Sequence, residues 1–202
     1  MSEFFIELFS EEIPAGLQRN SRNVLLENFQ NLFEEKKILF KKSSSFSTPN
    51  RLIILFEGLS KEITQKAEEI KGPNVNAPDK AVEGFLRSNQ IDKKDLFIKK
   101  IEKGEFYFFK KPTNKTNTID LLQEYTPLIL DKLQWKKSMI WGNYNLSWAR
   151  PLKSILAVFG NKSLDFKFHH LISSNTTFTD KEFEDKKKIF KTFKSYKDFF
   201  NQ

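Results

Sequence analysis

Short apolar runs of strand length alternate with apolar patterns of helical spacing, and this alternation limits most strongly what the chain can fold into. Residues 4–9 are apolar apart from Glu7, which is typical of a buried strand. In residues 15–36, apolar side chains recur at helical spacing, which predicts an amphipathic helix. A second strand is expected at 51–57, after the irregular segment Thr48-Pro49-Asn50. The alternation predicts an α+β chain with antiparallel or mixed sheets.

Turn residues between apolar runs predict several β-hairpins. The expected strand pairs are 96–101 with 105–110 around Lys103-Gly104, 138–141 with 145–149 around Gly142-Asn143-Tyr144, and 152–159 with 164–169 around Gly160-Asn161. Two further amphipathic helices are expected. One begins near Pro78 with Asp79 as its N-cap. The other begins at Thr118 and contains Pro127, which predicts either a kink or two shorter helices.

Other segments carry weaker periodicity. The serine run 43–45 is expected to interrupt regular structure, and 61–71 is expected to form an edge strand that Gly72-Pro73 ends. Beyond Ser173 the pattern is weaker still, because residues 180–188 are highly charged and 189–200 are aromatic and basic. Candidate internal boundaries within residues 1–202 lie at 71–80, a Gly-Pro loop, and at 111–117, a polar run. A chain of 202 residues suits one or two domains with a hydrophobic core.

The chain is basic, with a net charge of +8 and a pI of about 9.4. Such a charge makes nucleic acid or an anionic membrane a candidate partner, although composition alone favours a solvated lysine-rich surface. Tryptophans at 135, 141 and 148 lie beside cations, as on RNA-contacting surfaces. Core tryptophans flanked by lysines account for the same pattern. The aromatic run 105–111 alternates poorly for a base-stacking surface and is expected in a buried sheet.

No residues with an evident catalytic or metal-binding arrangement are found. The absence of cysteine excludes disulfides, thiolate zinc sites and cysteine nucleophiles. The seven glycines are too widely spaced for G-x-G-x-x-G, and none begins a P-loop. His169 and His170 are consecutive, so on a strand they would point to opposite faces rather than share a metal. Glu11 and Glu12 are interpreted as an acidic lead-in to the first helix rather than as an acid–base pair.

The sequence also predicts a cytoplasmic protein that does not cross a membrane. The N-terminus lacks the basic segment and apolar run of a signal peptide. The longest apolar runs, 52–56 and 155–159, are far shorter than the roughly 20 residues that a bilayer-spanning helix needs. The lack of cysteine agrees with a reducing compartment.

Several short blocks occur in a fixed order. They are Phe5-Ile6-Glu7-Leu8, Ser10-Glu11-Glu12-Ile13-Pro14, Thr48-Pro49-Asn50-Arg51-Leu52, Lys71-Gly72-Pro73, Ala81-Val82-Glu83-Gly84-Phe85 with Arg87-Ser88, Met139-Ile140-Trp141-Gly142 and Arg150-Pro151. Their order and spacing resemble the N-terminal part of the β subunit of bacterial heterotetrameric glycyl-tRNA synthetase. That family reads roughly E-x-G-T-E-E-L-P, T-P-R-R-L, R-G-P, A-x-x-G-F-x-R-S, M-R-W-G and R-P. The resemblance extends from Phe5 to about His170 and implies a fragment or a truncated form of a longer protein.

The resemblance implies a non-catalytic portion of a glycine–tRNA ligase. In that family the α subunit carries the class II aminoacylation site and uses ATP, with Mg²⁺, and glycine. The β subunit supplies contacts to tRNA(Gly) and to the α subunit, and the complete enzyme is an α2β2 heterotetramer. This chain alone is therefore expected to bind no cofactor and to be inactive.

Charge and resemblance together give five candidate tRNA-binding residues: Arg87, Lys136, Lys137, Arg150 and Lys153. The arginines are favoured because a planar guanidinium can grip a phosphate at two points. The sequence also departs from the family pattern T-T-R-G-H-R-F, because Thr176-Thr177 is followed here by Phe178-Thr179-Asp180. A stand-alone RNA-binding or scaffold module with no role in aminoacylation remains the alternative.

Overall fold

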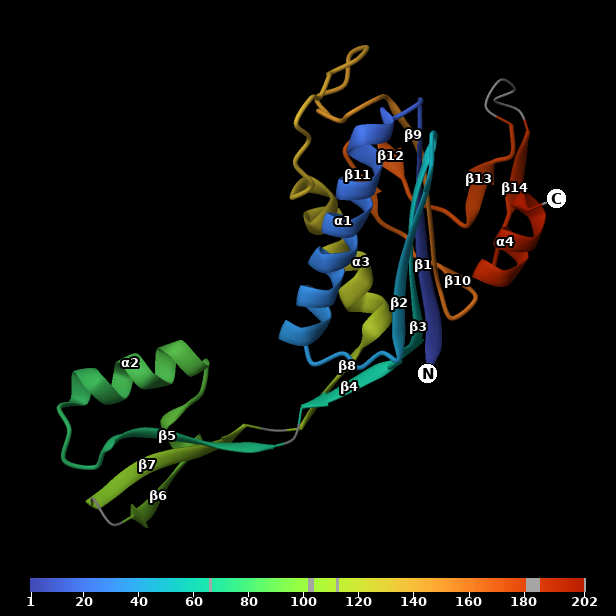
Figure 1. Ribbon diagram of the computed structural model, residues 1–202. Coiled ribbons are helices and arrows are strands. Elements are labelled where there is room, and N and C mark those ends of the chain that lie inside the picture. The colour runs from blue at the N-terminus through green and yellow to red at the C-terminus, as the bar shows by residue number, and fades with distance from the viewer. Residues whose placement is uncertain (66, 102–103, 112, 181–185, 202) are drawn as a thin grey trace. The chain divides into compact units, whose positions relative to one another are not determined.

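The computed structural model describes residues 1–65, 67–101, 104–111, 113–180 and 186–201, and the chain forms two compact units. Unit 1 comprises Met1–Ile63 and Thr116–Gln202, and unit 2 comprises Thr64–Lys115 (Figure 1). The chain leaves and re-enters unit 1 through β4 (Glu62–Gln65) and β8 (Asn114–Asn117), which pair as a two-stranded sheet. The return point lies within the polar segment 111–117, whereas 71–80 lies inside unit 2.

An antiparallel five-stranded sheet forms the centre of unit 1. Its strands in spatial order are β10 (Lys162–Ser163), β9 (Leu152–Phe159), β1 (Ser2–Ser10), β3 (Arg51–Leu59) and β2 (Lys42–Thr48). The expected strands at 4–9, 51–57 and 152–159 are therefore confirmed. The turn at Gly160-Asn161 joins β9 to β10, and both residues have positive φ, as a type I′ turn requires.

Both faces of this sheet are covered, which explains why β1, β3 and β9 are nearly continuous apolar runs. Because side chains alternate along a strand, Phe4, Ile6 and Leu8 share one face and Phe5 and Phe9 share the other. The first face packs against α1 (Ala15–Glu35) and α3 (Thr118–Asp131) in the main core (Figure 1). The second face packs against α4 (Phe193–Phe200) in a smaller aromatic core.

The expected helix α1 is confirmed. Of the two alternatives for the helix that contains Pro127, a kinked helix or two shorter helices, α3 excludes the second because it continues through Pro127 as one helix. A proline inside a helix costs about 3 kcal/mol. The buried face of α3 includes Leu122, Ile129 and Leu130. Each such side chain contributes about 1.5–3 kcal/mol on burial, so packing outweighs the local cost of proline.

Three expectations for unit 1 are wrong. The serines at 43–45 do not interrupt regular structure but lie in β2. The segment 138–149 is joined by a single bridge, Met139 to Trp148, instead of a hairpin. The segment 164–169 contributes β11 (Lys167–Phe168), which pairs with β12 (Leu171–Ile172) rather than with β9. Beyond Ser173, where the sequence pattern is weak, β13 (Thr176–Phe178) pairs with β14 (Lys187–Ile189).

Unit 2 is a three-stranded antiparallel sheet with one helix. The spatial order of the strands is β5 (Glu68–Asn74), β7 (Gly104–Lys111) and β6 (Leu96–Ile101). Along the chain, α2 (Asp79–Asn89) and a 3-10 turn at Lys93–Asp95 connect β5 to β6. The expected β6–β7 hairpin is confirmed, although Lys103 lies outside the described residues. β5 does not end at Gly72-Pro73, because a register shift between Lys71 and Asn74 accommodates the proline. The N-cap of α2 is Pro78 rather than Asp79, whose carboxylate lies in the first turn.

No helix in the described part of the chain has the length and apolar character needed to cross a membrane.

Candidate functional site

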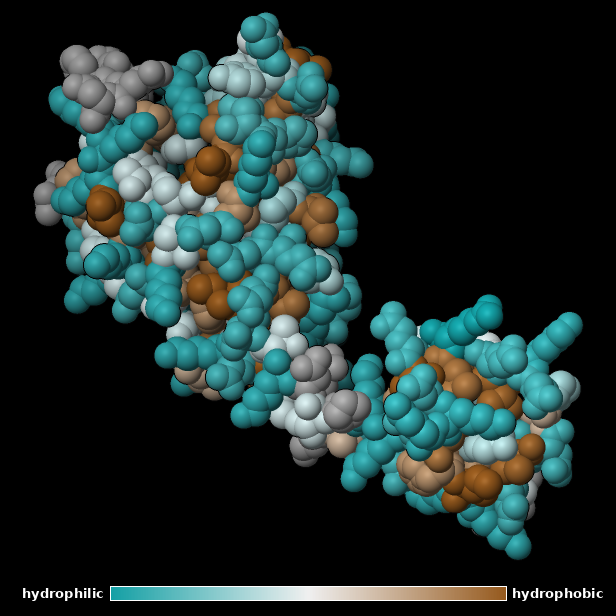
Figure 2. Space-filling view, turned by 180° about the vertical axis from the view of Figure 1, so that it is seen from behind, coloured by the Kyte–Doolittle hydropathy of each residue, from teal (hydrophilic) through white to brown (hydrophobic). Residues whose placement is uncertain are grey.

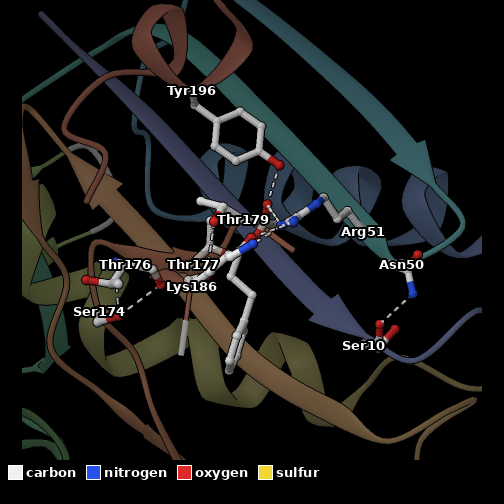
Figure 3. A network of polar contacts seen from close by, with 11 residues as sticks. Ser10, Asn50, Arg51, Ser174, Thr176, Thr177, Thr179, Lys186 and Tyr196 are labelled. Atoms are coloured by element: carbon white, nitrogen blue, oxygen red, sulfur yellow. Dashed lines mark hydrogen bonds and ion pairs between the residues drawn. The ribbon is translucent and has the colours of Figure 1, made fainter. Parts of the chain in front are cut away.

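A buried ion pair joins the two central strands of unit 1. Glu7 of β1 is completely buried, and Arg51 at the start of β3 is 8% exposed. The register places both on the sheet face that packs against α4. Arg51 Nη1 donates to Glu7 Oε2 at 2.6 Å and to Thr177 Oγ1 at 3.2 Å, and Arg51 Nη2 donates to the carbonyl of Phe178 at 2.6 Å (Figure 3).

The C-terminal part of unit 1 supplies the remaining partners of the carboxylate. Thr177 Oγ1 donates to Glu7 Oε1, and the Tyr196 hydroxyl donates to Glu7 Oε2 (Figure 3). The Arg51 guanidinium also lies over the rings of Phe9 and Phe200, at 4.5 and 4.3 Å from their centroids. One carboxylate thereby joins β1 to β3, β13 and α4.

This arrangement stabilises a fold rather than performing acid–base chemistry. Both Glu7 oxygens accept hydrogen bonds, and the guanidinium that neutralises them is itself held by Thr177 and Phe178. Burial raises the pKa of Tyr196, and the negative charge of Glu7 raises it further. The phenol therefore remains a donor at neutral pH. A buried pair of this kind is costly to break, because the remaining charge loses its compensation.

The raised pKa of Tyr196 predicts a loss of stability at alkaline pH. An unfolded tyrosine ionises near pH 10, whereas the folded phenol stays protonated, so stability is complete below pH 10 and falls above it. For this single group we expect a slope of about 1.4 kcal/mol per pH unit. Chemical unfolding of wild type and Tyr196→Phe between pH 8 and 11 measures it, since the variant lacks the titrating group. Parallel curves for the two proteins above pH 10 would contradict a buried, protonated Tyr196.

The other acidic and imidazole candidates do not assemble into a catalytic set. Glu11 does not lie in the first turn of α1; it forms an ion pair with Lys153 at 3.1 Å. His169 Nε2 lies 3.0 Å from Asp131 Oδ1, while the ring of His170 stacks on Tyr144 at 3.7 Å. Burial and the neighbouring His169 lower the pKa of His170. Among the described residues, no cluster of three His, Cys, Asp or Glu side chains could hold a metal ion.

The five candidate tRNA-binding residues are divided between the units. Arg87 is exposed on α2 of unit 2, whereas the other four belong to unit 1. Lys136 and Lys137 are exposed after α3. Arg150 is half-buried and donates to the carbonyl of Ala149 at 2.9 Å, and Lys153 is the partner of Glu11. The structure thus places four of the candidates on unit 1 and one on unit 2.

The nearby tryptophans belong to the core rather than to a stacking surface. Trp148 is 1% exposed and packs edge-to-face on Trp135 with ring centroids 5.1 Å apart. Trp135 and Trp141 are partly buried against the main core. Of the two interpretations of these aromatics, the structure supports core packing. The role of Glu7 was not predicted, although a single acid inside an apolar strand was its visible signal.

Comparison with known proteins identifies the family. The family model described as glycyl-tRNA synthetase beta subunit matches residues 4–202. The chain is 39% identical over 197 residues to the glycine–tRNA ligase beta subunits of Rickettsia canadensis (strain McKiel) and Rickettsia bellii (strain OSU 85-389), and 38% identical over 197 residues to that of Rickettsia prowazekii (strain Madrid E). These alignments cover 98% of this chain but 29–30% of the relatives, so the chain spans less than a third of their length. The chain therefore belongs to the glycyl-tRNA synthetase beta-subunit family.

Proposed function

We propose that the chain is a non-catalytic part of a glycine–tRNA ligase and supports the attachment of glycine to tRNA(Gly) through contacts with the tRNA and the α subunit. The observation that carries this proposal is the contrast between the buried charges and the surface charges of the chain. The buried Glu7–Arg51 pair is satisfied internally, whereas Lys136, Lys137 and Arg87 are exposed. A surface of this kind can bind phosphates but offers no activated nucleophile.

The chemistry of aminoacylation is assigned in this proposal to the α subunit, which would use ATP with Mg²⁺ and form an α2β2 complex with the β subunit. This chain would position the tRNA and contribute to the subunit interface. The sequence has no nucleotide-binding loop of the P-loop or G-x-G-x-x-G kind, which agrees with such a division of labour.

We expect this chain alone to form no glycyl-adenylate, but to bind tRNA(Gly) with an affinity that falls steeply with salt, because binding releases condensed counterions. The direct test incubates the chain with ATP, glycine and tRNA(Gly), and measures tRNA affinity at several salt concentrations. Adenylate formed by the isolated chain would contradict the non-catalytic role. Binding of tRNA without any association with the α subunit would instead support a stand-alone RNA-binding module.

An adjacent lysine pair allows a matched comparison. Reversing Lys136 and Lys137 to Glu should weaken tRNA binding and reduce the salt slope by about 1 for each phosphate that the variant no longer neutralises. The control reverses Lys187 and Lys188, a similarly exposed adjacent pair on β14. Thermal melting of both variants separates weaker binding from impaired folding. Equal decreases of affinity in the two variants would contradict a binding role specific to Lys136 and Lys137.

A further inference from the structure

One face of the sheet in unit 2 is covered by α2. Ile70, Leu96 and Phe109 lie in one row across the three strands, on the side of the sheet that α2 covers. The Phe85 ring of α2 packs edge-to-face on Phe109, with centroids 5.9 Å apart. A Cβ atom at Gly72 would lie 2.8 Å from the Phe85 ring, so only glycine permits this close approach of helix and sheet.

The opposite face, which we call the open face, carries alternating aromatic and basic side chains. The register pairs Phe97 and Lys71 with Phe108, and Lys99 with Phe106. Lys110 extends the same row on β7, opposite Glu69. Along the described strands, Glu69 is the one acidic residue that the register places on this face, against three lysines. Figure 2 shows apolar surface on the smaller unit among polar side chains.

The side chains of the open face already contact one another as cation–aromatic pairs. Lys71 Nζ lies 3.7 Å above the centroid of Phe106, and Lys99 Nζ lies 5.8 Å from that of Phe108. The rings of Phe97 and Phe108 are nearly parallel, at 28°, with centroids 6.1 Å apart. Phe108 is 8% exposed and supports Phe97, which is 38% exposed. An aromatic ring with this exposure on an open sheet is available to a planar ligand.

We propose that the open face binds unpaired nucleotides of RNA. Bases would stack on Phe97 and Phe106, and backbone phosphates would pair with Lys71, Lys99 and Lys110. Stacking of exposed bases on aromatic side chains of a sheet, beside cations that follow the backbone, is a general mode of single-strand recognition. This proposal rests on the proposed function, because it takes RNA to be the ligand of the chain. It adds that unpaired nucleotides of that RNA bind to the open face.

The ammonium groups above the rings are compatible with this ligand. An exposed cation–π contact is weaker than stacking of a base on an aromatic ring. When a nucleotide binds, the flexible lysine can therefore turn its ammonium to the phosphate and leave the ring to the base. The expectation of a buried sheet at 105–111 agrees with the burial of Phe108 and Phe109, which are 8% and 5% exposed, while alternation places Phe106 and Phe108 on the open face and Tyr107 and Phe109 on the covered one.

A protein partner fits the open face less well. The cores of protein–protein interfaces are depleted in charged residues, and lysine is among the depleted types. Here Lys71 Nζ lies 3.7 Å from the centroid of Phe106, and Lys99 Nζ lies 5.8 Å from that of Phe108 and 2.7 Å from the Glu69 carboxylate, so an apolar partner would have to bury these charged groups. A polyanion with planar bases compensates the charge and covers the rings at once.

The test uses the full chain and an eight-nucleotide single-stranded RNA containing 2-aminopurine, whose fluorescence falls on stacking. We expect Phe97→Leu and Phe106→Leu each to weaken binding about tenfold and to reduce the quenching, because leucine keeps apolar volume but offers no ring. Lys99→Gln should also weaken binding, whereas Lys100→Gln should not, because these neighbours on β6 point to opposite faces. Melting temperatures confirm that the variants fold.

The outcomes separate this proposal from the one on which it rests. If wild type and Phe97→Leu bind the single-stranded RNA with equal affinity, the stacking role of Phe97 is overturned. The proposed function would still stand if reversing Lys136 and Lys137 abolished binding of tRNA(Gly). If Phe97→Leu abolishes binding of the single-stranded RNA and the wild-type chain has no affinity for tRNA(Gly), the open-face proposal would be supported and the proposed function contradicted. If Phe97→Leu still binds the α subunit but Phe97→Asp does not, the open face would be a protein-docking surface and the RNA assignment would be overturned.

Discussion

Replacing Arg51 with methionine is expected to destabilise the protein by about 3–5 kcal/mol, because it leaves a completely buried carboxylate without its counterion. Methionine keeps much of the side-chain volume and its packing against Phe9 and Phe200 but cannot donate a hydrogen bond. The guanidinium also holds Thr177 and the Phe178 carbonyl, so the substitution removes those hydrogen bonds as well. Urea-induced unfolding at neutral pH measures the change.

A double variant shows whether the cost comes from the uncompensated charge. Glu7→Gln combined with Arg51→Met should cost less than the sum of the single changes, because no charge is then left buried. The exposed pair of Glu69 and Lys99, at 2.7 Å, provides the comparison. Removing that pair should change stability by less than about 1 kcal/mol. A cost for Arg51→Met as small as this would show that water reaches Glu7 and compensates its charge.

The Glu7–Arg51 network also explains how the C-terminal part of unit 1 is held. Thr177, Phe178 and Tyr196 reach the sheet through this pair, and Tyr196 and Phe190 complete an aromatic cluster on the same face. The family pattern would place arginine, glycine and histidine directly after Thr177, but here Phe178 supplies a backbone carbonyl and a ring instead. The ring of Phe178 stacks on Phe9, with centroids 5.2 Å apart. In this chain the segment therefore functions in packing.

Elements with a clear local pattern could be predicted from the sequence, and elements formed by tertiary pairing could not. β1 is marked by a short apolar run and α1 by clear helical periodicity, so their positions were predicted within a few residues. β2 reads as a polar break because its serines carry no apolar signal. It is a strand because it pairs along β3 and because its serines bond to α1, as in Gln30 Nε2 to Ser43 Oγ at 2.9 Å and Arg22 Nη1 to Ser47 Oγ at 3.1 Å.

The same limit applies to the site. Glu7 is visible in the sequence as an acid within an apolar run, but its partners lie 44, 170 and 189 positions away. No local pattern indicates which of the distant polar residues would reach it. The open face of unit 2 could not be predicted for a different reason. Residues 106–109 are all aromatic, and only the observed register shows which of these rings share a face with the lysines.

The second large effect is expected in the main core. Phe56 of β3 is completely buried, and its ring lies 4.7 Å from that of Phe33 and 5.1 Å from that of Phe40, both in edge-to-face geometry. Phe56→Ala should lower the free energy of unfolding by about 3–5 kcal/mol, because it removes transfer energy and leaves a cavity that the surrounding rings cannot fill. Denaturant unfolding measures this change. An unchanged m-value would show that the substitution lowers stability without altering how much surface is exposed on unfolding.

Phe46 on the adjacent strand β2 supplies the matched control. It is 40% exposed and its ring stacks on Phe193, so Phe46→Ala removes the same atoms from a site that water can refill. We expect this change to cost less than about 1.5 kcal/mol, the upper range for an aromatic pair. If both variants were destabilised to a similar extent, the aromatic cluster around Phe56 would not be the main core of unit 1. A larger effect at Phe56 would instead establish that β3, with α1 packed on it, carries the stability of unit 1.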